Sequence, residues 1–283
     1  MTDSISRELR AAAQRGDVES CLASIKNGGD IKSLNAFDWQ ALHQGARFGH
    51  RNICHILIEH GADIHARTRF GQTALHLSVV SESIETFLWL IDQGCDIHAV
   101  DHHGATTLHM AARRGLTDFC IILVNKGTDV HAKDNAGRTA LYGPAVNGFT
   151  ETCLALIDRG AAADVCDNQG LTLLHWAAMS HPDTNGQYTS ADRKRHLETY
   201  LALINKGADV VAKNNWNWTP LQIAAWYGEA DICLLLLKHG ADAHSKSNTG
   251  QAPLDLAVKR EHGVCVTAIR TWLSARTDVT GLN

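Results

Sequence analysis

The sequence predicts an all-α solenoid in which short helix-turn-helix units stack side by side. A leucine recurs every 33 residues, with one interval of 47, at Leu9, Leu42, Leu75, Leu108, Leu141, Leu174, Leu221 and Leu254. A glycine recurs with the same intervals at Gly61, Gly94, Gly127, Gly160, Gly207 and Gly240. Two agreeing registers indicate internal repeats of one supersecondary unit. Because one unit cannot bury both faces of its helices, we expect neighbouring units to build a continuous core.

One unit shows how the local pattern specifies these helices. Thr106 is a good helix N-cap, so residues 107–114 are expected to form a first helix. A glycine then turns the chain, and residues 117–126 are expected to form a second helix. Apolar side chains lie on one face of that second helix, at Phe119, Ile122 and Leu123. Residues 128–137 are rich in turn formers and predict a hairpin-like finger that leads into the next unit.

A short motif recurs at the start of the first helices. Its copies are QALHQGA at 40–46, TALHLSV at 73–79, TTLHMAA at 106–112, TLLHWAA at 172–178 and TPLQIAA at 219–225. With this motif and a 33-residue unit, the sequence resembles the ankyrin-repeat family over about residues 4–274. The resemblance implies a right-handed ankyrin-repeat solenoid. We expect a single domain, 1–283, of about eight units, with capping units at 4–34 and 247–274.

Four histidines occupy one repeated slot at the start of the first helix: His43, His76, His109 and His175. An imidazole there can hydrogen-bond the N-cap residue and the turn backbone of the neighbouring unit. Four copies with the period of the repeat favour this structural role over a catalytic centre, which needs one special copy.

Five cysteines share another repeated slot, just before an aliphatic run on the second helix: Cys21, Cys54, Cys120, Cys153 and Cys233. This slot suits a small buried side chain, and copies in adjacent units are expected to lie beyond disulfide distance. Free thiols indicate a reducing compartment, the cytoplasm or the nucleus. The first residues also lack the apolar segment of a secretory signal, so we do not expect export.

A second set of histidines lies in the fingers, where the ankyrin family usually has Asn: His65, His98, His131 and His244. One interpretation is that they cap the finger turn as Asn would. A second is a metal site for copper, zinc or iron, built from His65, His98, His102, His103 and His131. The resemblance also implies that this slot is a substrate for 2-oxoglutarate-dependent asparaginyl hydroxylases, because a leucine precedes each copy by eight residues, at Leu57, Leu90, Leu123 and Leu236. We expect no cofactor as the first choice.

The resemblance implies that partners bind to the finger tips and to the concave groove formed by the first helices. These positions are rich in aromatic and arginine side chains, which dominate interface hot spots. The predicted partner-binding residues are Phe37, Trp39, Arg47, Phe48, Arg69, Phe70, His102, His103, Arg113, Arg114, Arg138, Trp216, Trp218, Trp226 and Tyr227. Lys259 and Arg260 extend this set.

Two irregularities break the repeat near its middle. Tyr142 replaces the helix-start histidine, and Gly143–Pro144 is expected to interrupt the first helix of that unit. The next unit carries a 14-residue insertion within 180–199, which is polar and predicted to be a surface loop between two helices. The alternative is that this loop closes a pocket over Tyr142, Trp176 and Met179. That arrangement would make a small-molecule site or a metal-dependent enzyme, with Tyr142, His175 and His181 as candidate catalytic groups.

Composition narrows the possible functions. A net charge of −4 and a pI near 6.5 argue against nucleic acid as the main partner. No stretch approaches the roughly 18 apolar residues of a membrane span. The sequence has no nucleophile motif, phosphate loop or H-E-x-x-H motif to support catalysis. We therefore expect a monomeric module that binds another protein, without intrinsic catalysis.

Overall fold

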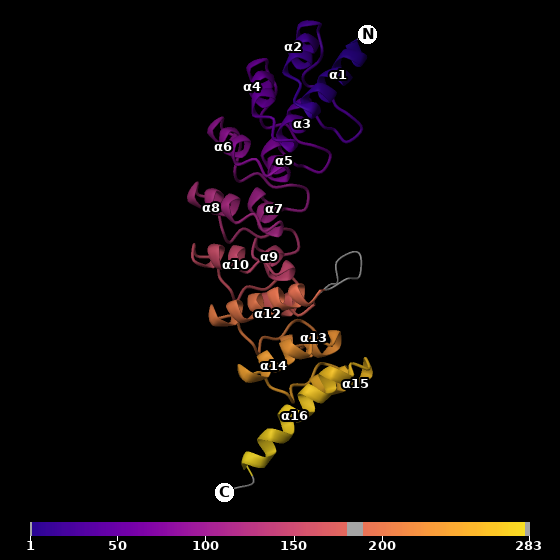
Figure 1. The fold of residues 1–283 in the computed structure, drawn as a ribbon, viewed down its shortest axis with the longest axis vertical. Coiled ribbons are helices and arrows are strands. Elements are labelled where there is room, and N and C mark those ends of the chain that lie inside the picture. The colour runs from indigo at the N-terminus through magenta and orange to yellow at the C-terminus, as the bar shows by residue number, and fades with distance from the viewer. Residues whose placement is uncertain (1, 180–188, 281–283) are drawn as a thin grey trace. The chain divides into compact units, whose positions relative to one another are not determined.

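The computed structural model describes residues 2–179 and 189–280, and its secondary structure is helical (Figure 1). Within these ranges the chain forms sixteen helices and no strand. Two isolated antiparallel bridges join Val100 to Thr106 and Cys166 to Thr172. The predicted all-α class is therefore confirmed. None of the described helices combines the length and the apolar character needed to cross a lipid bilayer.

The chain divides into two compact units. The first runs to Ala111 and includes Asp118–Asn135, and the second consists of Ala112–Thr117 and the chain from Ala136 onwards. In the first unit, first helices stack on first helices and second helices on second helices (Figure 1). The helices of this unit, the last two of which share one end with the second unit, are α1 (Thr2–Arg15), α2 (Val18–Lys26), α3 (Ala41–Arg47), α4 (Arg51–Glu59), α5 (Ala74–Ser81), α6 (Ile84–Asp92), α7 (Thr107–Arg113) and α8 (Thr117–Asn125).

Helices α7 and α8 confirm the two helices predicted at 107–114 and 117–126. The second unit repeats the arrangement of the first. First helices α9, α11, α13 and α15 contact one another in turn, as do second helices α10, α12, α14 and α16. Their bounds are α9 (Tyr142–Asn147), α10 (Thr150–Ile157), α11 (Leu173–Ala177), α12 (Ser190–Asn205), α13 (Pro220–Tyr227), α14 (Ala230–Lys238), α15 (Pro253–Lys259) and α16 (Gly263–Thr280).

The repeating leucines form the core, as their period predicts. Seven of the eight are at most 1% exposed: Leu9, Leu42, Leu75, Leu108, Leu141, Leu174 and Leu221. Burial of each leucine side chain contributes about 1.5–3 kcal/mol to folding. Leu254 is only half-buried, because α15 is the last first helix that the structure describes and no further helix covers it.

The helix-start histidines His43, His76 and His175 tie their repeats to the next, which confirms the predicted structural role of this slot. The Nδ1 atom of His76 accepts a hydrogen bond from the backbone N–H of Thr73 at 3.3 Å. On the opposite side of the ring, Nε2 donates to the carbonyl oxygen of Ala105, in the next finger, at 3.3 Å. Equivalent contacts are made by His43 (Nε2 to Ala66 O, 3.0 Å), His175 (Nε2 to Trp218 O, 2.8 Å) and, on its Nδ1 side, His109 (from Thr106 N–H, 3.2 Å).

These contacts require a neutral imidazole, because Nδ1 must accept while Nε2 donates. Burial lowers the pKa of His43, His76 and His175 from the ordinary value of 6.5, which keeps the rings neutral. In the slot of α13 the chain uses a glutamine instead. Gln222 accepts from the Thr219 N–H at 2.8 Å and donates to the Gln251 carbonyl at 2.8 Å, so an amide makes the same two bonds without a titrating group.

Acid should therefore weaken the folded state at these junctions. The unfolded chain binds protons at histidines that stay neutral when folded, so the free energy of unfolding falls as pH drops below about 6.5. The slope is at most about 1.4 kcal/mol per pH unit for each buried histidine. We expect His76→Gln to reduce the loss of stability in urea unfolding between about pH 7 and pH 5.5, relative to the wild type.

The matched control is His65→Gln, because His65 is exposed. It should leave the pH dependence unchanged. If His76→Gln shows the wild-type slope, the buried imidazole does not resist protonation.

A second repeated histidine joins the repeats and was not recognised in the sequence. The Nε2 atoms of His50, His196 and His262 contact backbone carbonyl oxygens two residues before a loop glycine of the preceding repeat, at 3.1, 2.8 and 3.0 Å. The rings cover Gly16, Gly148 and Gly228, which have positive φ, and a Cβ on Gly16 or Gly228 would meet the ring within 2.8 Å.

All five cysteines of the repeated slot are fully buried thiols, as predicted. Burial raises the pKa of Cys54, Cys120 and Cys153 to about 12. A sixth buried cysteine, Cys265, continues the slot on α16, and its Sγ lies 3.4 Å from that of Cys233. The sequence analysis did not foresee this contact, because the last interval is 32 residues rather than 33.

Thiol labelling should distinguish one cysteine from the others. Cys166 is exposed and the other seven cysteines are buried. At about pH 8, iodoacetamide should modify Cys166 of the native chain at least about tenfold faster than any other cysteine, because only accessible thiolates react. Peptide mapping by mass spectrometry gives the rates. Fast labelling of Cys54 or Cys120 without denaturant would contradict the packing of the second helices.

The first helix at Pro144 is shortened rather than interrupted, which corrects the expectation for that stretch. Helix α9 begins at Tyr142, so Pro144 falls in its first turn, where its missing N–H has no helical partner to lose. Gly143 permits a close approach to the preceding first helix. A Cβ at this position would lie 2.6 Å from the Cα of Arg113.

The insertion is not simply a surface loop, which corrects a second expectation. Residues 180–188 lie outside the described residues. The remaining part begins α12, whose N-cap Thr189 accepts from the Asp192 N–H at 3.1 Å while the Asp192 carboxylate accepts from the Thr189 N–H at 3.1 Å. This reciprocal capping box starts a helix of 16 residues, whereas the neighbouring second helices α10 and α14 have 8 and 9 residues.

Candidate functional site

The finger loops end in a turn that determines where their side chains emerge. The Oδ1 atom of Asn214 accepts hydrogen bonds from the backbone N–H groups of Trp216 and Trp218, at 3.0 and 2.9 Å. Such a turn presents the residues two and four positions after the acceptor. The same turn recurs in the other fingers at Asn35, Thr68, Asp101, Asp167 and Ser247.

Backbone hydrogen bonds join successive fingers within each unit. In the first unit, the N–H groups of Arg69, His102 and Asn135 donate to the carbonyls of Phe37, Phe70 and His103 at 2.9–3.3 Å. In the second, those of Asn168, Asn215 and Asn248 donate to Ala136, Gln169 and Trp216 at 3.0–3.4 Å. The fingers of a unit therefore form a continuous ledge whose side chains keep a regular spacing.

The first unit carries six of the predicted partner-binding residues, five of them in arginine–aromatic contacts and Phe48 stacked on His50. We call Phe37, Trp39, Arg47, Phe48, Arg69 and Phe70 the N-terminal aromatic surface. The guanidinium carbon of Arg69 lies 5.6 Å from the ring centre of Phe37 and 5.1 Å from that of Phe70. The guanidinium carbon of Arg47 lies 5.3 Å from the ring centre of Trp39. Phe37 is nonetheless 53% exposed and Phe70 44%, so these side chains remain available to a partner.

The second unit carries a comparable surface, formed by Trp216, Trp218, Trp226, Tyr227, Lys259 and Arg260, which we call the C-terminal aromatic surface. Trp226 lies at its centre. Its ring packs edge-on against Trp218, with centroids 5.6 Å apart, and Arg260 lies 4.6 Å above it. Trp216 is 50% exposed and Tyr227 39%. Because Arg260 and Trp218 hold Trp226 from two sides, little side-chain entropy is lost when a partner covers it.

Arg113, Arg114 and Arg138 belong to the second unit and lie outside this surface. Arg113 and Arg114 are exposed at the end of α7. Arg138 lies 4.5 Å above the ring of Tyr142, which in turn packs edge-on against Trp176 at 4.9 Å. These rings line a cavity of only about 10 Å³, the space that about one water molecule needs. The described part of this pocket has no room for a small-molecule substrate.

The candidate catalytic groups are not brought together by the described residues. His175 is 0% exposed, and both of its ring nitrogens are used: Nδ1 accepts from the Thr172 N–H of its own repeat, and Nε2 donates to the Trp218 carbonyl of the next. Tyr142 lies between Arg138 and Trp176. His181 lies outside the described residues. Tyr142 and the buried His175 therefore have structural contacts, and a catalytic role for these residues with His181 stays a prediction.

The finger histidines do not cap their turns, which corrects the first interpretation. The acceptor is the aspartate two residues earlier, as at Asp63, whose Oδ1 accepts from the backbone N–H of His65 at 2.9 Å. The same bond recurs at His98, His131 and His244. The imidazoles are exposed, and among the described residues no three His, Cys, Asp or Glu side chains form a group that could hold a metal ion. His102 instead covers Gly71, where a Cβ would lie 2.6 Å from its ring.

Hydroxylation of the finger histidines stays a prediction. The four leucines that precede them, Leu57, Leu90, Leu123 and Leu236, are fully buried. An enzyme that contacts these leucine side chains therefore needs the repeat to unfold locally.

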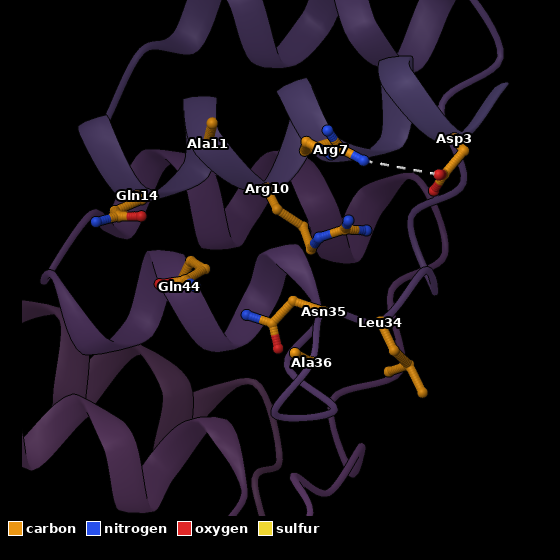
Figure 2. A pocket seen from close by; sticks show the side chains of 9 residues that line it. All are labelled: Asp3, Arg7, Arg10, Ala11, Gln14, Leu34, Asn35, Ala36 and Gln44. Atoms are coloured by element: carbon orange, nitrogen blue, oxygen red, sulfur yellow. Dashed lines mark ion pairs between the residues drawn. The ribbon is translucent and has the colours of Figure 1, made fainter. Parts of the chain in front are cut away.

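A polar pocket in the first unit was not anticipated from the sequence (Figure 2). It lies beside α1, and Arg7 and Arg10 contribute their side chains to it. The sequence analysis treated this unit as a cap, so its arginines were not examined. Their spacing of three residues on one helix was the available signal, because it places both side chains on the same face.

The comparison with family models assigns the chain. A model of ankyrin repeats matches in three copies, over residues 9–101, 108–214 and 188–272. These matches span most of the chain, which therefore belongs to the ankyrin-repeat family. A comparison with curated proteins gives no match. Ankyrin repeats are in general protein–protein interaction modules, and this general class of function is the one that the family supports.

The side-chain turn of Asn214 should stabilise the finger that carries Trp216 and Trp218. Asn214→Ala removes the acceptor of two hydrogen bonds in a buried position and should lower the free energy of unfolding by about 1–3 kcal/mol. Asn214→Asp should restore most of it, because Asp101 and Asp167 close the equivalent turns. Urea unfolding followed by tryptophan fluorescence measures both. Asn205→Ala, at an exposed position, is the control and should change stability by at most about 0.5 kcal/mol. Wild-type stability of Asn214→Ala would show that the turn forms without its acceptor.

Proposed function

We propose that this chain recognises a partner protein through the N-terminal and C-terminal aromatic surfaces. The exposure of large rings held by arginines is the observation that supports this proposal. Phe37 and Trp216 are half exposed, although the core does not need them. Such side chains cost apolar hydration when free and contribute most of the affinity when a partner buries them.

The chemistry of these surfaces favours a protein over a nucleic acid. Four of the rings, Phe37, Trp39, Phe70 and Trp226, are paired with a guanidinium, and such pairs offer both apolar area and forked hydrogen-bond donors. The chain as a whole has a net charge of −4, which opposes association with a polyanion. We propose that the partner is a protein with an apolar segment flanked by acceptor groups.

The state of the cysteines supports a proposal about the compartment. All eight are thiols, and seven of them are buried in or beside the core. A core built with thiols at repeated positions suits a reducing compartment, the cytoplasm or the nucleus. We propose that the chain works there as a monomer.

The proposed function is tested by capture of the partner with matched variants. The tagged wild-type chain, the surface variants Trp226→Ala and Phe70→Ala, and the control Val264→Ala are crosslinked in a host-cell extract. Captured proteins are then quantified by mass spectrometry. Loss of a hot spot costs about 2 kcal/mol or more, which is a loss of about 30-fold in affinity. We expect at least one protein to be captured by the wild type and the control, and to be depleted in the surface variants.

Val264 is a suitable control because it is 77% exposed and apolar but lies on α16, outside both surfaces. Circular dichroism confirms that each variant keeps its helices. Equal capture by the wild type and all surface variants would contradict the assignment of the binding surfaces.

A further inference from the structure

The pocket beside α1 is large enough for a side chain of a partner. Its volume is about 470 Å³. It lies between α1, the loop at residues 34–36 and Gln44 of α3, all within the first unit (Figure 2). The helix side is lined by arginines, and the loop side carries Leu34 and Asn35. The pocket therefore combines positive charge, amide groups and a short apolar wall.

Arg10 supplies a pre-oriented hydrogen-bond donor. This residue is only 9% exposed, and its Nη1 donates to the hydroxyl of Ser33, which holds the guanidinium in place. Figure 2 shows the guanidinium pointing away from α1 into the pocket. A guanidinium carries five N–H donors in a fixed plane, so one bond to Ser33 leaves others for a ligand. Holding Arg10 before binding reduces the entropy lost on contact.

Asn35 supplies a second donor from the opposite side. Its Oδ1 atom accepts from the backbone N–H groups of Phe37 and Trp39 at 2.8 and 3.0 Å. Because the oxygen closes the finger turn, the orientation of the amide is set, and the side-chain NH₂ group lies on the side of Gln44 (Figure 2). An acceptor placed between Arg10 and Asn35 therefore meets donors from two elements.

The charge of the pocket matches one carboxylate. Arg7 and Arg10 carry two positive charges, and Asp3, which is paired with Arg7 at 3.9 Å, carries one negative charge. The sum is one positive charge, which a carboxylate neutralises, whereas a phosphate with a charge of about −1.5 to −2 exceeds it. A planar carboxylate also fits the forked geometry of a guanidinium.

The neighbouring surface indicates what kind of molecule carries this carboxylate. Asn35 joins the pocket to the N-terminal aromatic surface, because Phe37 and Trp39 donate to its side chain. Leu34 is 51% exposed at the pocket wall and can cover the methylene groups of a glutamate. A single extended segment with an acidic residue followed by apolar residues complements both features.

We infer that this pocket binds the side-chain carboxylate of a glutamate in an acidic, partly apolar segment of the partner protein. The inference rests on the proposed function and specifies the chemistry of its partner. Arg10 and Asn35 donate to the carboxylate, and Arg7 contributes charge at the rim. The apolar residues of the segment lie on the N-terminal aromatic surface.

Short peptides test this inference on the full chain. The probe is a fluorescein-labelled octapeptide of alternating leucine and glutamate with an amidated C-terminus. Matched probes carry glutamine or phosphoserine in place of glutamate, and another carries glutamine with a free C-terminal carboxylate. Fluorescence anisotropy at low salt gives the affinities. We expect the glutamate peptide to bind at least about tenfold more tightly than each of the others, the usual scale for a charge-assisted contact of about 1.4 kcal/mol.

Substitutions locate the binding. Arg7→Gln, at an exposed position, should lower the affinity for the glutamate peptide at least about threefold. The double variant Arg7→Gln Arg10→Gln should bind the glutamate peptide no more tightly than the wild type binds the glutamine peptide. Arg51→Gln is the control, because Arg51 is a half-exposed arginine on α4, outside the pocket. It should change the affinity less than about twofold. Circular dichroism shows whether the Arg10 variant keeps its helices, and Arg7→Gln keeps the test valid if it does not.

The outcomes separate this inference from the proposed function. Equal affinities for the glutamate and glutamine peptides, or equal losses in Arg7→Gln and Arg51→Gln, would overturn the carboxylate pocket. Tighter binding of the phosphoserine peptide or of the free C-terminus would also overturn it. If Phe70→Ala lowers the affinity for the glutamate peptide while Arg7→Gln does not, the peptide binds to the aromatic surface and the assignment of the pocket is wrong. Unchanged partner capture by all surface variants instead removes the proposed function itself.

Discussion

The structure depends on one recurring interaction, the two-sided hydrogen bond that a neutral side chain makes at the start of α3, α5, α11 and α13. It satisfies an N–H group at the helix start and a carbonyl of the next finger, as His76 does for Thr73 and Ala105. Both groups are buried between repeats, where an unpaired polar group costs about 1–3 kcal/mol. The bond therefore specifies the register in which repeats stack. Burial of the leucines favours stacking but does not select one register over another. Leucines alone would permit neighbouring repeats to slide.

Because the fingers are held by this bond and by their own side-chain turns, their outer residues are not needed for stability. Asn35 and Asn214 close the turns, and the residues two and four positions after each of them are tryptophan or phenylalanine. The same turn also directs the amide of Asn35 toward the pocket beside α1. In Asn35, the side-chain oxygen closes the turn and the side-chain NH₂ group faces the pocket. The exposed side chains of a finger can therefore vary while its backbone stays the same.

The sequence predicts most of what repeats and misses what occurs once, although the repeated contacts of His50, His196 and His262 were also missed. The leucines, the helix-start histidines and the buried cysteines were identified because each has a period of 33 residues that can be compared within the chain. The start of α9 at Tyr142 and that of α12 at Ser190 depend on single substitutions and on an insertion, for which the chain has no second copy to compare. The candidate surfaces were predicted as residue types, but their division between the two units and the cation–π pairs required coordinates. The pocket at Arg10 was missed because its donors are oriented by Ser33 and by a turn, neither of which is visible in a one-dimensional pattern.

The glutamine at position 222 has a consequence for how the chain responds to acid. At the starts of α3, α5 and α11 the bond to the next finger comes from an imidazole that can take up a proton, whereas at the start of α13 it comes from an amide that cannot. When mild acid protonates a helix-start histidine, its Nδ1 can no longer accept the hydrogen bond from the helix start. Gln222 keeps both of its hydrogen bonds at the same pH. The bond at the start of α13 therefore does not weaken when the pH falls, although the same two repeats are also joined by the imidazole of His262, which contacts the Trp226 carbonyl.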